Sequence, residues 1–141
     1  NKDYSNYDKW LNFGSRQRID NRKLSLVCPR QLDKFSVSTN NGNGKLIYPV
    51  GMITAEEMAY AGAVIWQTNT SYYLYNEVNS WSFSPYSLSV WDARGFGLNS
   101  SGYFSNDVVT GSLGGRPVVS LKQGIAVASG SGTSSSPYII N

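Results

Sequence analysis

Apolar and polar residues alternate over short stretches of this chain, and Gly, Asn and Ser lie between those stretches. A period of two is typical of strands that bury one face, and Gly, Asn and Ser favour turns. The pattern therefore predicts short strands joined by many loops on one scaffold. The predicted strands are residues 23–27, 34–38, 45–50, 63–66, 72–75, 81–83, 88–91, 95–98, 103–104, 108–109 and 117–121.

Two Gly-rich stretches predict particular connections. Residues 40–44 read Asn-Asn-Gly-Asn-Gly between two predicted strands, which indicates a hairpin. Residues 129–136 are almost entirely Gly and Ser, but apolar runs at residues 125–128 and 137–140 flank them. We therefore expect an ordered surface loop there and not a flexible linker.

Helix signals are few. Thr54 and Glu57 form a Thr-x-x-Glu capping box, which predicts a short helix over residues 55–61. Gly62 follows and tolerates the left-handed conformation that ends many helices. The spacing of apolar residues within residues 4–14 also predicts a short helical turn.

Size and composition favour one globular domain. The chain has 141 residues, of which 40% are hydrophobic, and no apolar run approaches the roughly 20 residues that span a bilayer. We expect residues 1–141 to form a single domain with no direct membrane insertion. The sequence begins with Asn1 and shows no signal-like segment, so we expect an ectodomain or processed product whose anchor or export signal lies upstream.

The lack of histidine and the single cysteine exclude several kinds of catalytic and metal site. The chain has no histidine, which excludes Ser-His-Asp, Cys-His and His-metal sites. Its single cysteine, Cys28, is expected to be a small buried hydrophobe, and a partner cysteine in upstream sequence is the alternative. The net charge is +3, but acidic residues interleave with the basic ones that gather before residue 35. We therefore expect a solvated basic surface and no nucleic-acid binding.

The later part of the chain carries several motifs in a fixed order. It resembles a family of bacterial surface and prepilin-linked proteins whose ectodomains share the C-type-lectin-like fold of formylglycine-generating enzymes. The resemblance covers most of residues 45–141 and leaves residues 1–44 outside it. The matching segments are residues 48–57, 59–62, 80–86, 115–122 and 130–138.

This resemblance implies an α+β fold with a C-type-lectin-like architecture, in which one or two short helices pack on a twisted antiparallel sheet with long irregular loops. Some relatives are variable proteins of diversity-generating retroelements, in which loop residues vary on a constant scaffold. By analogy, residues 81–115 are expected to form an exposed binding face. Fold analogy does not identify the ligand.

The sequence departs from the enzymes and lectins of this fold. The sulfatase-modifying relatives depend on cysteine chemistry, which the lone Cys28 does not supply, so that activity is not carried over. Calcium-binding lectins cluster acidic and amide oxygens, whereas Asn99, Asn106 and Asp107 offer too few carboxylates for such a site. We therefore expect no metal and no cofactor.

The candidate site comes from residues 81–115. Their Tyr, Trp, Ser, Gly and Asn content is typical of binding loops, and an ordinary hairpin with a buried face explains it equally well. Alternation favours core positions for Trp81 and Phe83, whereas Tyr86 is expected at the surface. The candidate ligand-binding residues are Tyr86, Trp91, Asp92, Arg94, Phe96, Asn99, Tyr103, Asn106 and Asp107.

Structural roles compete with binding at the charged positions. Asp92 and Arg94 are close enough to pair with each other across a turn. Arg116 precedes a closing apolar strand, and we expect it to bond loop carbonyls and not an acidic ligand.

Three functional hypotheses follow. The first is a non-catalytic, adhesin-like domain that binds a protein or glycan and is displayed outside a bacterial cell. The second is a structural pilin or pseudopilin subunit, whose surface contacts other subunits of an extracellular filament. The third is a glycosidase that uses Asp92 and Asp107, which requires both carboxylates to flank one cleft.

Overall fold

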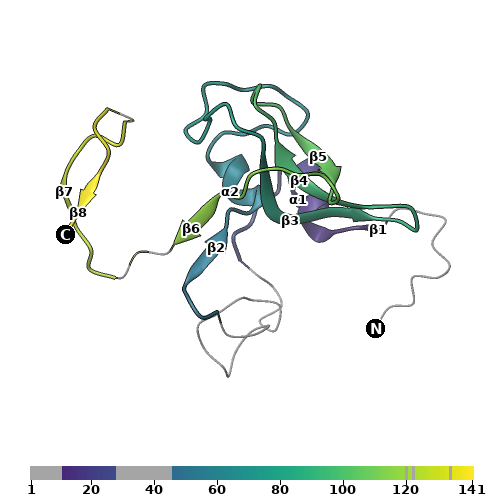
Figure 1. Ribbon diagram of the computed structural model, residues 1–141, viewed down its shortest axis with the longest axis horizontal. Coiled ribbons are helices and arrows are strands. Elements are labelled where there is room, and N and C mark those ends of the chain that lie inside the picture. The colour runs from purple at the N-terminus through teal and green to yellow at the C-terminus, as the bar shows by residue number, and fades with distance from the viewer. Residues whose placement is uncertain (1–10, 28–45, 120, 122, 134) are drawn as a thin grey trace.

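The computed structural model describes residues 11–27, 46–119, 121, 123–133 and 135–141. Within these residues lie two short helices and strands that pair antiparallel (Figure 1). The fold is therefore α+β, as expected. The elements in chain order are β1 (Leu11–Asn12), α1 (Gly14–Asp20), β2 (Val50–Met52), α2 (Ala55–Tyr60), β3 (Ser80–Leu88), β4 (Ala93–Leu98), β5 (Phe104–Val108), β6 (Pro117–Val119), β7 (Val127–Ser129) and β8 (Ile139–Ile140).

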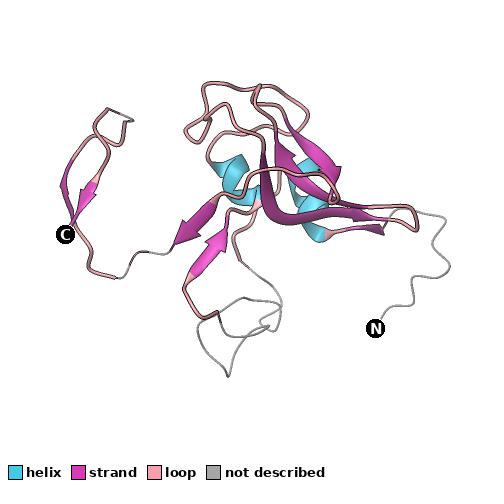
Figure 2. Cartoon of the chain, in the orientation of Figure 1, coloured by secondary structure: helices cyan, strands magenta, loops and turns pink. Residues whose placement is uncertain are grey.

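The largest sheet has the strand order β1-β3-β4-β5. Its longest strand, β3, bends sharply, so the sheet curls (Figure 2). Two register shifts accompany the bend, between Trp81 and Pro85 and between Pro85 and Ser87. Such irregularities bend a strand and increase its twist. The curled sheet has an inner face, which packs on the helices, and an outer face, which does not.

The core lies between the inner face and the two helices. Phe96 on β4 and Phe104 on β5 are fully buried, and their ring centroids lie 5.6 Å apart. Ile19 of α1 and Met58 of α2 complete this cluster from the helix side. Burying aromatic and aliphatic side chains together removes apolar surface from water, which is the main favourable contribution to folding.

Helix α2 confirms the predicted capping box. The backbone N–H of Glu57 donates to Thr54 Oγ1 at 3.2 Å, and the Glu57 side chain accepts from the backbone N–H of Thr54 at 2.7 Å. These two bonds satisfy N–H groups that have no partner within a helix. Gly62 has the expected left-handed backbone, with φ of +112°.

Helix α1 differs from the prediction. The sequence predicted a helical turn in residues 4–14, of which residues 4–10 lie outside the described residues, and the helix that the structure shows is Gly14–Asp20. Ile19 is its buried apolar residue, and Arg16 pairs with Asp20 one turn later. One apolar residue gives no visible period, so packing and an i,i+4 ion pair define this helix.

Several predicted strands are wrong. Residues 23–27, 63–66 and 72–75 form no strand, and most of residues 88–91 form the turn between β3 and β4. In the long connection between α2 and β3, apolar side chains enter the core singly from turns, as Tyr72 does. In these stretches the aromatic and β-branched residues are therefore explained by burial of single side chains and not by strand pairing.

Of the predicted strand at residues 45–50, only Val50 is in a strand: residues 47–49 are bends, residue 46 is irregular and residue 45 is not described. The predicted strand at residues 34–38, the turn at residues 40–44 and Cys28 lie outside the described residues.

Two further pairs of strands lie outside the main sheet. β2 pairs with β6 beside the bend of β3, and β7 pairs with β8 in a hairpin that stands apart from the rest of the fold (Figure 1). In the loop of that hairpin, the backbone N–H groups of Ser131 and Gly132 both donate to the Ser136 carbonyl at 3.0 Å. The described residues of this loop therefore bond to one another, while the apolar flanks Val127 and Ile139 are exposed.

Candidate functional site

The two faces of β3 are the reverse of the sequence prediction. Ser82 and Ser84 are buried on the inner face, whereas Phe83 is 49% exposed on the outer face and Trp81 is half-buried. The prediction of Phe83 as a core residue is therefore wrong. The inner face at this point meets polar groups of α2, and serine hydroxyls satisfy those groups where an aromatic ring does not.

A polar network joins β3 to both helices on this inner face. The Glu56 carboxylate is buried and accepts hydrogen bonds from the Arg18 guanidinium, with Nε at 2.9 Å, and from the Ser84 hydroxyl at 3.2 Å. The Ser84 hydroxyl also accepts from the backbone N–H of Ala55 at 3.0 Å. Ser15 of α1 donates to the Pro85 carbonyl at 2.6 Å. The carboxylate is fully partnered, so the network is structural.

Tyr86 is a core residue, which corrects the expectation that it lies at the surface. It is 6% exposed, and its ring meets that of Phe96 edge-on with centroids 5.0 Å apart. Phe96 is itself fully buried, so its predicted role in contacting a ligand is also wrong. The Arg16 guanidinium lies over the Tyr86 ring, 4.3 Å from the centroid. This geometry is that of a cation–π contact.

Arg94 lines the same cavity as Arg16 and Tyr86. Arg94 Nε donates to Asp92 Oδ2 at 3.2 Å, which confirms the predicted pair, and Nη1 donates to Asn106 Oδ1 at 3.1 Å. The cross-strand register explains the second bond, because Asn106 lies opposite Phe96 and its side chain shares the face of Arg94. Arg94 is thereby held from two sides.

These side chains line a shallow cavity of about 220 Å³, which we call the arginine depression. Its lining residues are Arg16, Tyr86, Ser87 and Arg94. Burial raises the pKa of Tyr86, while the nearby Arg16 and Arg94 charges act in the opposite direction. The depression therefore presents guanidinium donors above a neutral phenol ring, and its lining holds no carboxylate to serve as a base.

The remaining predicted site residues are not in the lining of the depression. Trp91 is 88% exposed in the turn between β3 and β4. Asn99 Oδ1 holds the β4–β5 turn by accepting from the backbone N–H groups of Ser101 at 3.0 Å and Tyr103 at 2.9 Å. Its role, and that of the Tyr103 backbone, is to fix a hairpin turn.

Asp107 lies on the other face of the sheet. It is opposite Gly95 in the register, one position from Asn106, and side chains alternate between faces along a strand. Asp92, in contrast, pairs with Arg94, which shares the face of Asn106. Asp92 and Asp107 thus do not flank one cleft.

Arg116 has the structural role that the sequence predicted. Its Nη1 donates to the Leu74 carbonyl and its Nη2 donates to the Asn76 side chain. Both partners belong to the long connection between α2 and β3, so Arg116 fixes that loop.

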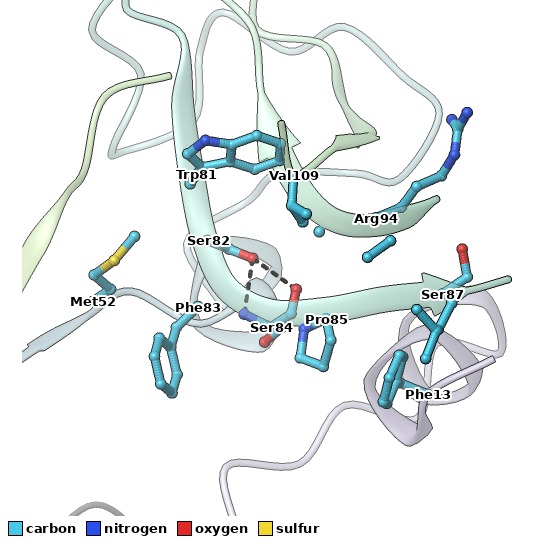
Figure 3. A pocket seen from close by; sticks show the side chains of 13 residues that line it. Phe13, Met52, Trp81, Ser82, Phe83, Ser84, Pro85, Ser87, Arg94 and Val109 are labelled. Atoms are coloured by element: carbon cyan, nitrogen blue, oxygen red, sulfur yellow. Dashed lines mark hydrogen bonds between the residues drawn. The ribbon is translucent and has the colours of Figure 1, made fainter. Parts of the chain in front are cut away.

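The outer face of β3 carries a second hollow, which the sequence analysis missed. Two adjoining cavities of about 380 and 560 Å³ share Met52 and Phe83 in their lining, and we call them together the apolar trough. Figure 3 shows Phe83 and Pro85 projecting from the bend of β3 into this region, while the Arg94 side chain extends away from them. The trough lining also includes Phe13, Trp81, Val109, Val50 and Pro117.

No group of three or more His, Cys, Asp and Glu side chains gathers closely enough to hold a metal ion in the part of the chain that the structure describes. None of the described helices is long and apolar enough to cross a membrane. Comparisons of the chain with models of protein families, with curated proteins and with solved structures give no significant match.

Proposed function

We propose that this chain is a non-catalytic recognition domain, displayed outside a bacterial cell, that binds its ligand at the arginine depression. The finer fold assignment, a C-type-lectin-like domain, is part of this proposal. The curled antiparallel sheet with two short helices and a long loop between α2 and β3 supports it. So does the resemblance of residues 45–141 to bacterial surface proteins.

One observation carries the proposal: two arginines from distant parts of the chain line one cavity, and the guanidinium of one of them lies over the Tyr86 ring. Arg16 comes from α1 and Arg94 from β4, and both line the cavity whose floor is Tyr86. Each is held by an acidic partner and an amide oxygen, Asp20 and Asn12 for Arg16. Side chains held in this way lose little conformational entropy when they bind a ligand.

The chemistry of the depression selects oxygen-rich ligands. Guanidinium groups only donate hydrogen bonds, and their planar donors suit the carboxylate and hydroxyl oxygens of a glycan or a protein surface. The Ser87 hydroxyl, in the lining of the same cavity, is buried without a hydrogen-bond partner. Nearby on the chain, the exposed Trp91 offers an apolar surface of the kind found in binding loops.

Two features support a non-catalytic role. The sequence has no histidine, and the Asp92 carboxylate is paired with Arg94. A glycosidase needs two carboxylates about 5 to 10 Å apart on either side of one bond. Asp92 and Asp107 point to different faces of the sheet, an arrangement that does not suit this chemistry.

Glycan and protein arrays probed with the purified domain test the proposal. Binding to at least one ligand is expected, and the double variant Arg16→Ala/Arg94→Ala should lower that signal by at least about tenfold, as expected from the loss of two charge-assisted hydrogen bonds. The matched control is Arg22→Ala/Lys23→Ala, which removes the same charge from exposed positions. Unchanged binding in the Arg16/Arg94 variant contradicts the proposed site, and ligand turnover that Asp92→Asn abolishes contradicts the non-catalytic role.

A further inference from the structure

Beside the β4–β5 hairpin lies a cavity of about 240 Å³, which we call the polar hollow. Its polar lining residues are Asn79, Asn99, Ser105, Asn106 and Asp107. The side chains of Ser105 and Asp107 share one face of the sheet, whereas Asn106 between them bonds Arg94 on the opposite face. None of the residues that line the hollow also lines the arginine depression, so the two sites are separate.

Two asparagines give the polar hollow hydrogen-bond donors. Asn79 Oδ1 accepts from the backbone N–H of Ser100 at 2.7 Å. Asn99 Oδ1 accepts from the backbone N–H groups of Ser101 at 3.0 Å and Tyr103 at 2.9 Å. These bonds define which end of each amide is the oxygen. The two NH₂ groups donate to no acceptor among the described residues, so both are available to a ligand.

Asp107 gives the same hollow a hydrogen-bond acceptor. Its side chain is exposed, and its one bond within the described part of the chain is from the backbone N–H of Val108 to Oδ1, at 2.7 Å. Oδ2 is therefore open to a ligand. The Ser105 hydroxyl, on the same face of the sheet, both donates and accepts. The described lining of the hollow contains no Lys or Arg.

Gly97 keeps the space between these groups open. It lies opposite Ser105 in the register, and a Cβ added to it would meet Leu113 and the Ser80 carbonyl no closer than 3.4 Å. Its φ is outside the left-handed region, so neither packing nor backbone conformation requires glycine here. Glycine within a strand often marks the close approach of a ligand. The Leu113 side chain adds an apolar surface to the lining.

We infer that the polar hollow binds one neutral sugar residue directly through side-chain hydrogen bonds. Each sugar hydroxyl both donates and accepts, so neighbouring hydroxyls match a carboxylate acceptor beside amide donors. The C–H groups of the sugar ring match Leu113. The hollow is smaller than the roughly 300 Å³ at which pockets for drug-sized ligands begin, which suits a single ring. This inference is independent of ligand binding at the arginine depression.

Charged ligands suit the polar hollow less well. An anion is repelled by the Asp107 carboxylate, and the described lining offers no cation to offset that repulsion. A cation only donates hydrogen bonds, whereas the two amides present donors and leave it without acceptors on their side. A neutral polyol alone uses both the donors and the carboxylate.

NMR titration of the isotope-labelled full chain with the methyl glycosides of glucose, galactose and mannose tests the inference. At least one of these sugars should shift the side-chain NH₂ signals of Asn79 and Asn99 along a saturable curve. The methyl glycoside of the matching uronic acid carries one carboxylate. It should bind about fivefold more weakly, because its charge lies near that of Asp107.

Two variants with matched controls locate the site, and circular dichroism verifies that each folds. Asp107→Asn keeps the shape of the side chain and should weaken binding about tenfold, because it removes a charge-assisted acceptor. It should also abolish the difference between the neutral sugar and the uronate. Glu77→Gln makes the same chemical change at an exposed position outside the hollow and should leave binding unchanged.

Gly97→Ala places a methyl group in the hollow and should also weaken binding of the sugar. Its control is Gly115→Ala, which adds the same group where no atom lies within 4 Å and should bind like the unmodified chain.

Any of four results overturns the inference. If no glycoside shifts either amide at any soluble concentration, the hollow takes no neutral sugar. If Asp107→Asn binds as tightly as the unmodified chain, the carboxylate does not contact the ligand. If Gly97→Ala binds as tightly, the ring does not enter the hollow. If the uronate binds as tightly as the neutral sugar or more tightly, the hollow does not select against an anion.

Discussion

The two faces of β3 carry side chains of opposite character in opposite surroundings. On the inner face, Ser82 and Ser84 are buried against helices, and Ser84 bonds the Glu56 carboxylate and the first turn of α2. On the outer face, Phe83 and Pro85 line the apolar trough. Polar residues therefore lie inside and apolar residues outside, contrary to the usual arrangement.

The difference shows that alternation of side chains indicates two unlike faces of a strand without indicating which face is buried. The element that packs on a face decides which side chains are buried there. A helix N-terminus and a buried carboxylate need hydrogen-bonding groups, which small serines supply at low volume. The aromatic side chain of Phe83, on the opposite face, is half-exposed. An exposed apolar patch of this kind commonly marks an interaction surface.

The comparison of the two faces is tested most strongly by replacing one phenylalanine on each face with alanine. Phe96→Ala, on the inner face of β4, should lower the free energy of unfolding by about 3 to 5 kcal/mol because it leaves a cavity in the core. Phe83→Ala, at a half-exposed outer position, should cost less than about 1 kcal/mol. Urea denaturation at low protein concentration measures both. Equal losses would place Phe83 in the core and refute the account of the outer face.

The buried carboxylate gives the next largest effect. Glu56→Gln should cost about 1.5 to 3 kcal/mol, because charge-assisted hydrogen bonds from Arg18 and Ser84 are weakened. Glu77→Gln makes the same chemical change at an exposed position and should change stability by less than about 0.5 kcal/mol. Thermal or urea denaturation distinguishes the two. A stable Glu56→Gln protein would mean that the inner polar network contributes nothing to stability.

The helix cap that faces this network contributes less. Thr54→Ala removes the side-chain acceptor for the Glu57 N–H and should cost about 1 kcal/mol. Thr110→Ala, in the exposed turn after β5, is the control and should cost less than about 0.5 kcal/mol. If both variants unfold at the same urea concentration, the capping box is not a stabilising feature.

Alkaline pH should produce the smallest change in the free energy of unfolding, and this change tests the burial of Tyr86. Burial raises the pKa of Tyr86 above 10.0, so the folded state holds its phenol proton more tightly than the unfolded state. The contribution of Tyr86 to the free energy of unfolding should therefore be constant below pH 10 and be lost as pH rises beyond it. Tyr86→Phe should reduce that loss, whereas Tyr73→Phe, at an exposed ring, should not. An unchanged slope in Tyr86→Phe would contradict the burial of this hydroxyl.

Local signals in the sequence predicted part of the fold correctly. The Thr54–Glu57 box, the left-handed Gly62 and the strand through residues 95–98 are all present, because each depends on neighbouring residues. Helix α1 was not predicted, since its single buried apolar residue gives no periodic signal. Residues 72–75 look like a strand but do not form one: Tyr72 is buried in the core, and Leu74 and Tyr75 pack against it without strand pairing.

The candidate site was likewise predictable only where its contacts join residues that are close in the sequence. Asp92 and Arg94 are neighbours across a turn, so their pairing follows from the sequence. Arg16 was missed as a site residue because its place over Tyr86 depends on how α1 packs, about which local sequence says nothing. Tyr86 was misplaced because a turn was expected after Pro85, whereas β3 continues through Pro85 and Tyr86 shares the buried face of Ser82 and Ser84. Which face of a strand is buried depends on the elements that pack on it.

An NMR titration tests the binding face most directly. The isotope-labelled protein is titrated with a ligand selected on the array, and the indole N–H signals of Trp91 and Trp81 are assigned by substitution. Trp91 lies in the exposed β3–β4 turn near Asp92 and Arg94, whereas Trp81 lies on the outer face in the trough lining. We predict that the Trp91 and Arg94 side-chain signals shift with added ligand while the Trp81 indole does not. A shift of Trp81 with Trp91 and Arg94 unmoved would place recognition in the apolar trough and contradict the proposed site.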